Sequence, residues 1–235
     1  MRASVLRFVT LLAWCGFFVW LTISGEVFRY VGPRTRWVVV FGAVILGLAS
    51  LLQALSVTSS RAAGHARLTS WTEGVGIAAL FAPIAVVMII PEPTLGSEAA
   101  ARKTAPGFVD SVGSFAPVPQ PGRDISFPEI NLASESSEYA AAVGIADGTE
   151  VRLTGFVTHP EAGPPGTFAL TRFATFCCAA DAVPYSVTVE AEKMSDPADD
   201  TWLTVSGTLV GKGNEFVLQP ERITKIHAPQ NPYIY

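Results

Sequence analysis

The stretch WLTVSGTLV-GKGN-EFVLQ, which spans Trp202–Gln219, decides the fold of the C-terminal half of the chain. Its two outer parts are rich in Val, Leu, Thr and aromatic residues, which favour strands, and Gly211–Asn214 between them is rich in turn-forming residues. The spacing predicts a β-hairpin with strands over Trp202–Val210 and Glu215–Gln219. The C-terminal half is therefore expected to be a β domain.

Three further strand patterns lie upstream of this hairpin. Thr149–Thr158 alternates between apolar and polar residues, and Phe168–Phe176 and Tyr185–Val189 form two more short apolar runs. Five strands within about 80 residues leave no room for long crossover helices, which indicates a small closed β structure. We expect an all-β domain, an OB-like five-stranded barrel, with a small β-sandwich as the alternative.

The barrel domain is expected to cover residues 131–235 and to begin with a short helix. Apolar residues recur at helical spacing over Asn131–Val143, and Asn131 is a suitable N-cap. Before it, residues 91–130 contain many Pro residues scattered among Gly, Ser and Ala, without a sustained period. This composition is typical of an extended, flexible linker.

Residues 1–90 are far more apolar than the rest. Only 15% of the whole chain is charged, whereas about 25% is usual for a soluble protein. Most of the hydrophobicity lies in three segments, about 5–24, 37–55 and 72–90, each close to the roughly 20 residues that span a bilayer. We expect about three transmembrane helices. The first is expected to stay uncleaved, because no A-x-A-like site follows it.

The two halves of the chain differ in charge. Residues 1–90 carry seven Lys or Arg against two acidic residues, whereas residues 91–235 carry nine against 18. An acidic C-terminal half argues against nucleic-acid binding, which needs a basic surface. Basic residues are nearly balanced between the two sides of the expected helices. We expect a multi-pass protein in the lipid bilayer of the cell membrane, with the N-terminus inside and the C-terminal domain extracytoplasmic.

Cys177 and Cys178 are adjacent and end an apolar run, and Asp181 follows three residues later. Neighbouring side chains in a regular strand point to opposite faces, so the two thiols could not share an ion there. If the chain instead turns helically, residues three and four apart become neighbours, and Asp181 faces both thiols. The pattern is then that of two sulfurs and one carboxylate at the mouth of the barrel.

Several roles for this cysteine pair stay open at the level of sequence. A structural zinc site normally has four ligands, and only three lie here, because regular strands would place His159 about 30 Å from Cys177. A soft ion such as Cu(I) accepts two thiolates, and a partner could complete its shell. The pair could also form a strained, reducible disulfide, or pack as small hydrophobic side chains, the role expected of Cys15.

Arg172 is expected to pair with Asp181 across the turn and hold it in place. The sequence contains no Ser/His/Asp arrangement, no Gly-rich phosphate loop and no paired carboxylates in a catalytic frame. We therefore expect a protein that is not an enzyme. No cofactor is certain from these residues, and a soft or transition metal, Zn or Cu, is the ion that the thiol pair favours.

The run Thr171–Pro184, which contains Cys-Cys-Ala-Ala-Asp, resembles the CCxAD signature of the YcgQ-like family of bacterial proteins, a domain of unknown function. Members of that family are predicted permease accessory subunits. Gly155–Val157, Trp202–Gly207 and the closing Pro229–Tyr235 also look similar, as does Tyr30–Arg34 between the first two apolar segments. The resemblance covers the chain except for the expected linker.

The resemblance implies a subunit that works beside a separate multi-spanning permease, with a link to metal homeostasis. It implies that Cys177, Cys178 and Asp181 contact a metal or substrate, with Arg172 in support. The first loop departs from the family pattern, because Gly32 stands where a histidine is expected before the proline. No ligand role is therefore carried over to that loop.

Three functional hypotheses follow. The first is a membrane-anchored, non-enzymatic permease subunit whose β domain presents the cysteine pair to a metal or substrate. The second is a redox or metal-sensing module in which the thiols respond to oxidation or to an ion. The third and weakest is a single-strand nucleic-acid-binding barrel, since OB barrels often bind such strands through aromatic side chains in a basic groove.

Overall fold

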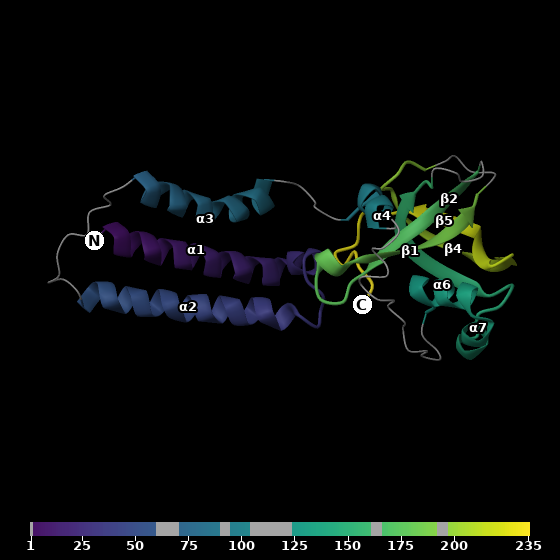
Figure 1. Ribbon diagram of the computed structural model, residues 1–235, viewed down its shortest axis with the longest axis horizontal. Coiled ribbons are helices and arrows are strands. Elements are labelled where there is room, and N and C mark those ends of the chain that lie inside the picture. The colour runs from purple at the N-terminus through teal and green to yellow at the C-terminus, as the bar shows by residue number, and fades with distance from the viewer. Residues whose placement is uncertain (1, 60–70, 90–94, 104–123, 161–165, 192–196) are drawn as a thin grey trace. The chain divides into compact units, whose positions relative to one another are not determined.

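The computed structural model describes residues 2–59, 71–89, 95–103, 124–160, 166–191 and 197–235. The chain divides into two compact units, residues 1–93 and 94–235. The first unit is helical, and the second is built around a β-barrel (Figure 1).

The helical unit contains three long helices and one 3-10 turn, namely α1 (Arg2–Ser24), η1 (Glu26–Arg29), α2 (Arg36–Ser59) and α3 (Trp71–Ile89). Within the described residues, two windows are long and apolar enough to cross a membrane, Val5–Ser24 and Arg36–Leu55. In α3, which contains Pro83, the apolar part is the shorter stretch Ala79–Ile89. Two of the expected spans are therefore present by length and composition, and the third is not established.

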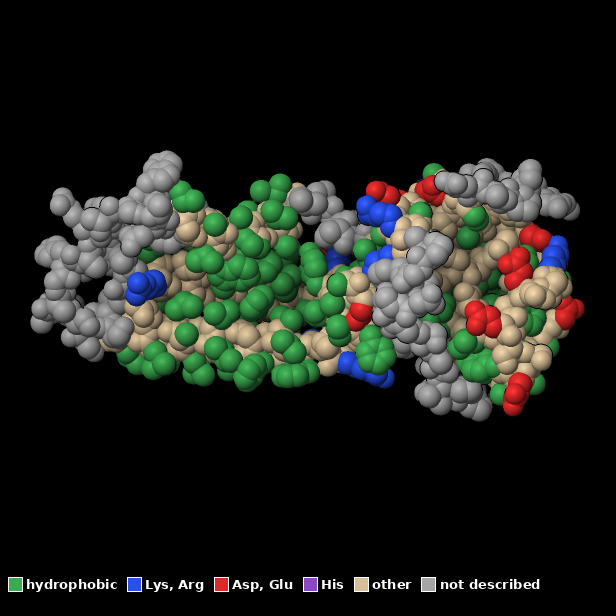
Figure 2. All heavy atoms as spheres, in the orientation of Figure 1, with side chains coloured by type: hydrophobic (Ala, Val, Ile, Leu, Met, Phe, Trp, Pro, Cys, Tyr) green, Lys and Arg blue, Asp and Glu red, His purple; other side chains and the backbone are tan. Residues whose placement is uncertain are grey.

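Helices α1 and α2 pack against each other. The Cys15 thiol donates to the Ala43 carbonyl at 3.4 Å, and the sulfur also lies beside Gly47. Cys15 thus packs between the two helices. The outer side chains of this unit are mostly large and apolar, and Trp37 is 65% exposed (Figure 2). Such a surface is unfavourable in water and suits a bilayer or an apolar partner.

The second unit contains a closed barrel of five strands, β1 (Glu150–Thr158), β2 (Thr167–Ala174), β3 (Val183–Glu190), β4 (Trp202–Lys212) and β5 (Glu215–Lys225). The strands follow the order β1-β2-β3-β5-β4, and β4 pairs with β1 to close the ring. Only the β3–β5 pair is parallel among the strand pairs of this barrel. A closed barrel is therefore present, as the five strand patterns predict, and not a sandwich.

The final hairpin is longer than its apolar pattern suggests. Strand β5 continues past Gln219 to Lys225, although Pro220 follows at once. The register of the β4–β5 pair shifts here, because Gly207 pairs with Pro220 and Ser206 pairs with Arg222, which leaves Glu221 as an extra residue on β5, as in a β-bulge. Gly207 lies so close to the backbone of β5 at this point that a Cβ atom would not fit.

Two short helices lead into the barrel, α6 (Phe127–Glu135) and α7 (Ser137–Val143). The predicted cap Asn131 lies inside α6, where its side-chain amide donates to the Ser186 carbonyl at 2.9 Å. Ser126 is the real cap, because its amide and hydroxyl both reach the Glu129 carboxylate, at 2.7 and 2.6 Å. The single predicted helix is thus two helices, and Phe127 and Ile130 of α6 are buried in the barrel core.

Part of the predicted linker over residues 91–130 is folded. Helix α4 (Ser97–Lys103) belongs to the barrel unit, and its Ala100 packs in a small core with Phe156 and Trp202. The Asp200 carboxylate accepts bonds from the Ser97 amide at 2.6 Å and from the Ser97 hydroxyl at 2.9 Å. Apolar burial and this cap dock α4, so these residues are not a flexible tether. Residues 104–123 lie outside the described residues.

Candidate thiol site

The two adjacent cysteines lie in a tight turn directly after β2. The turn is completed by the 3-10 helix η2 (Ala179–Asp181). The Asp181 carboxylate accepts backbone amides from Phe176 at 2.9 Å, from Cys177 at 2.8 Å and from Cys178 at 3.4 Å. One carboxylate thus satisfies three successive amides that the end of the strand leaves unpaired.

This turn brings the two sulfurs and the carboxylate together. The Sγ atoms of Cys177 and Cys178 lie 3.7 Å apart, and the three potential ligand atoms, including a carboxylate oxygen of Asp181, all lie within 4.8 Å of one another. Neither cysteine forms a disulfide. Cys177 is exposed to solvent, and the other two residues are half-buried. The group is therefore open on one side to an ion or a partner.

The carboxylate and the thiols shift each other's pKa values. The hydrogen bond from its thiol to Asp181 is the largest cause that raises the pKa of Cys177 to about 12, followed by the bond to Cys178. For Asp181, partial burial opposes ionisation, but hydrogen bonds from the Cys177 thiol and from the three amides outweigh it and lower the pKa. At neutral pH the resting group is a carboxylate bound by a protonated thiol.

The lowered pKa of Asp181 has a definite consequence for pH. A carboxyl group whose pKa is depressed by folding stabilises the folded turn above its ordinary pKa range. That stabilisation is complete at neutral pH and is lost as the pH falls through the lowered pKa. The turn should therefore open in acid.

Lys103, the last residue of α4, holds the same turn from a distant part of the sequence. Its ammonium donates to three carbonyls of the turn, at 3.3, 3.1 and 2.8 Å, those of Ala179, Ala180 and Ala182. A cation is favourable where a helical turn ends in unpaired carbonyls. Burial lowers the pKa of Lys103, and the nearby Asp181 carboxylate opposes this. Lys103 was not among the predicted site residues, although its place at the end of the helix-favouring run SEAAARK can be read from the sequence.

Lys103→Met is expected to loosen the thiol turn. Because the turn loses a charged donor to three carbonyls, its opening free energy should fall by about 2 kcal/mol, which means about 30-fold faster amide exchange. Hydrogen-exchange mass spectrometry of the full chain, read on residues 176–182, measures this. Arg102→Met is the matched control, since its exposed guanidinium pairs with Glu98 at 3.3 Å and, among the described residues, with no part of the thiol turn. Equal exchange in both variants would rule out a role of Lys103 in the turn.

The predicted ion pair between Arg172 and Asp181 is absent. The Arg172 guanidinium donates instead to three backbone carbonyls, those of Asn231 at 2.9 Å and of Pro232 and Thr154 at 3.3 Å each. The reason is the position of Arg172, which lies within β2 and not in the turn that follows it. Its side chain projects from one face of the strand, away from the Asp181 carboxylate. Arg172 therefore fastens the closing segment of the chain to the barrel and does not contact the carboxylate.

The remaining candidate ligand, His159, lies elsewhere. Its Nδ1 atom is 2.8 Å from the Asp199 carboxylate, beyond the end of β1. Among the described residues, the only group of three or more metal-ligating side chains is the cysteine pair with Asp181. The group thus offers three potential ligand atoms.

Fold and site together define a class. It is a two-unit protein with two N-terminal helices apolar enough to span a membrane, and a closed five-stranded barrel that carries a Cys-Cys-Asp turn. Residues 6–105 match the DUF1980 N-terminal domain, and residues 138–235 match the DUF1980 C-terminal domain. The chain therefore belongs to the DUF1980 family, which confirms the YcgQ-like resemblance. No curated protein matches the chain.

Proposed function

We propose that this protein is a membrane-anchored, non-enzymatic accessory subunit of a permease, and that its barrel binds a zinc-like metal ion through Cys177, Cys178 and Asp181. The observation that carries the proposal is the 3.7 Å distance between the two sulfurs. A tetrahedral zinc ion with Zn–S bonds of about 2.3 Å requires its two sulfurs to lie about 3.8 Å apart. The turn therefore holds the thiols at the separation that such an ion needs.

The 3.7 Å distance between the two sulfurs disfavours a linear Cu(I) site. A linear two-thiolate Cu(I) site places the sulfurs on opposite sides of the ion, separated by twice the bond length. Adjacent cysteines held on one side of a turn are too close for that. With three protein ligands, the fourth position is left to water, substrate or a partner, as in zinc sites that keep an open position. This suits delivery or sensing of an ion more than permanent structural zinc.

The redox alternative is weaker because of the electrostatics of the pair. Thiol–disulfide exchange needs the thiolate, and the Asp181 hydrogen bond raises the pKa of Cys177 to about 12. A metal ion can overcome this barrier, because a coordinating thiol gives up its proton. The Cys177 thiol is thus a poor nucleophile at neutral pH while it remains available to a metal.

The finer features of the proposal concern fold, topology and partner. The strand order β1-β2-β3-β5-β4 with a parallel β3–β5 pair supports an OB-like barrel. We propose that α3 is a third span, which would place the barrel outside the cytoplasm. Phe176, next to the thiols, is 62% exposed and is the only large apolar side chain that exposed among the described residues of the barrel unit. It suits contact with a multi-spanning permease that completes the metal shell.

Full-length, reduced protein in lipid nanodiscs is expected to bind one Zn(II) or Co(II) ion. Tetrahedral thiolate coordination gives cobalt a characteristic absorption, and Cys177→Ser or Cys178→Ser should weaken affinity at least about tenfold. Because the metal displaces protons from the thiols, its apparent affinity should rise as the pH rises. Near neutral pH the increase should be about tenfold per pH unit for each proton displaced. Cys15→Ser is the matched control, because that thiol lies between α1 and α2. Full binding after loss of both Cys177 and Cys178 would sink the metal proposal.

The proposed sidedness has its own test. In the Asp181→Asn variant, which lacks the carboxylate that raises the pKa of Cys177, a membrane-impermeant maleimide should label this exposed residue in intact cells. Labelling that requires permeabilised cells would place the barrel in the cytoplasm. Mass measurement of unlabelled protein would show a loss of two hydrogens if the pair were oxidised, which would favour the redox alternative.

A further inference from the structure

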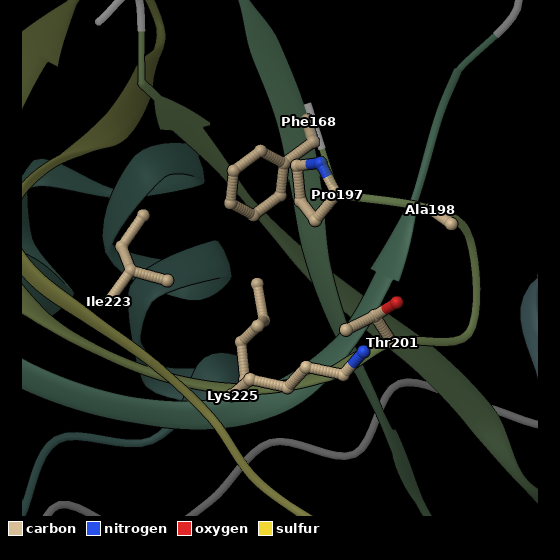
Figure 3. Close-up of a pocket in the computed structure, with 7 residues that line it drawn as sticks. Phe168, Pro197, Ala198, Thr201, Ile223 and Lys225 are labelled. Carbon is tan, nitrogen blue, oxygen red and sulfur yellow. The ribbon is translucent and has the colours of Figure 1, made fainter. Parts of the chain in front are cut away.

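A cavity lies in the barrel unit, near the opposite end of β2 from the thiol turn. It has a volume of about 350 Å³ and is lined by residues of β2, β4, β5 and the segment before β4, namely Phe168, Pro197, Ala198, Thr201, Leu203, Ile223 and Lys225 (Figure 3). Phe168 is near the start of β2, whereas the cysteines follow its end. The cavity is thus separate from the proposed metal site.

The walls of this cavity are apolar. Phe168 and Leu203 are buried and belong to the main core of the barrel, and Ile223 packs against that core. In Figure 3 Phe168, Pro197 and Ile223 are seen around the cavity that all three line. The volume falls in the range of small-molecule sites, about 300–1,000 Å³. The cavity can therefore hold the apolar body of a small molecule.

One cation stands at this apolar cavity. Lys225 pairs with Leu203 across the β4–β5 ladder, so both side chains leave the sheet on the same side. In Figure 3 the Lys225 chain extends along the cavity with its nitrogen at the Thr201 end. Among the described residues, Lys225 is the only charged side chain that lines the cavity, and its ammonium contacts no carboxylate. An anionic group on a ligand in the cavity would pair with the Lys225 ammonium.

Two side-chain contacts hold the loop before β4 that forms one wall of the cavity. Asp199 bonds to His159 at 2.8 Å, and Asp200 holds the N-terminal end of α4 through Ser97. Asp200 has φ 62°, a left-handed conformation that costs a non-glycine residue energy. Both acidic side chains are thus engaged elsewhere, and neither lines the cavity. These contacts hold the loop residues that follow Ala198 in place, which lowers the cost of ordering them on binding.

We propose that this cavity is a binding site for a small amphipathic carboxylate, whose apolar body contacts Phe168 and Leu203 and whose carboxylate pairs with Lys225. The chemistry follows from the lining, which combines apolar walls with the exposed ammonium of Lys225, which contacts no carboxylate among the described residues. The site is independent of the thiol turn, so either proposal can fail without the other.

The test uses the full chain in nanodiscs of zwitterionic lipid and three water-soluble probes with the same apolar body. These are fluorophenylbutanoate, the corresponding primary amide and the corresponding amine, followed by fluorine NMR titration, with empty nanodiscs as background. The wild-type protein should bind the carboxylate at least tenfold more tightly than the amide, and the amine most weakly. Equal affinity for the three probes, preference for the amine, or no measurable binding of the carboxylate would each overturn the proposal.

Two variants locate the site. Lys225→Gln should weaken carboxylate binding about tenfold and leave amide binding unchanged, because it removes only the charged partner. Arg222→Gln makes the same charge change on β5 at an exposed position outside the cavity and should have no effect. Ala198→Trp, at an exposed loop position, fills the cavity and should block all three probes. Unchanged carboxylate binding in Lys225→Gln or Ala198→Trp contradicts the assignment.

Discussion

Asp181→Asn is expected to make Cys177 react with iodoacetamide up to about 40-fold faster at pH 8. The hydrogen bond to the Asp181 carboxylate is the main reason that the pKa of Cys177 is raised to about 12. An asparagine keeps the size of the side chain but carries no charge. The pKa of the thiol should then return toward its ordinary value.

The size of this effect combines two opposing changes. Loss of the whole rise, about three pKa units, would increase the thiolate fraction at pH 8 by nearly a thousandfold, but a less basic thiolate is also intrinsically less nucleophilic. With a Brønsted coefficient of about 0.45, the largest net gain is about 40-fold, and the remaining hydrogen bond to Cys178 makes the gain smaller. Tandem mass spectrometry of the alkylated chain assigns the label to Cys177 or Cys178.

A matched control exists within the barrel unit. The Asp147 carboxylate also accepts a backbone amide, that of Gly211 at 3.0 Å, but the Cys-Cys-Asp turn does not include it. Asp147→Asn should leave the reactivity of Cys177 unchanged. If Asp181→Asn alkylates no faster than the wild type, the carboxylate does not control the thiol, and the electrostatic argument against redox chemistry loses its basis. The same variant should weaken Zn(II) binding, because it removes the third ligand.

Arg172→Met is expected to release the closing segment of the chain from the barrel. The Arg172 guanidinium donates to the carbonyls of Thr154, Asn231 and Pro232, and burial lowers the pKa of Arg172 although the Tyr235 side chain opposes this. The substitution removes a half-buried charged donor from three carbonyls. The free energy that holds the closing segment on the barrel should therefore fall by about 3 kcal/mol. Lysine cannot replace it, because one ammonium does not reproduce the fork of the guanidinium.

The reporter for this prediction is the Ile234 amide, which donates to the Phe173 carbonyl at 2.8 Å. Its hydrogen exchange in the full chain should become about 100-fold faster in Arg172→Met. Arg222→Met, an exposed arginine on β5, should change exchange by less than a factor of two. The Ile234 carbonyl also accepts the Thr175 amide at 3.0 Å, just before the thiol turn. Faster exchange at residues 176–178 should therefore accompany release of the segment.

The features that the sequence could predict depend on neighbours along the chain. Apolar runs such as Val5–Ser24 and alternation such as that in Thr149–Thr158 reflect local burial, so two membrane-length helices and the strands appear close to where the patterns place them. The cysteine–carboxylate group is also local, because Cys177, Cys178 and Asp181 lie within one turn. Their grouping needs only a helical turn after the strand.

The tertiary structure alone decided the contacts made across long sequence separations. Lys103 reaches carbonyls 76 to 79 residues away, and Arg172 reaches carbonyls 59 and 60 residues away instead of the nearby Asp181. Helix α4 docks because the barrel offers Asp200 and an apolar patch, neither of which is visible in a Pro-rich stretch. Local pattern determines which elements form, because it depends on chain neighbours. The partners of a charged side chain depend on which elements the closed barrel brings together, and therefore only the folded structure settles them.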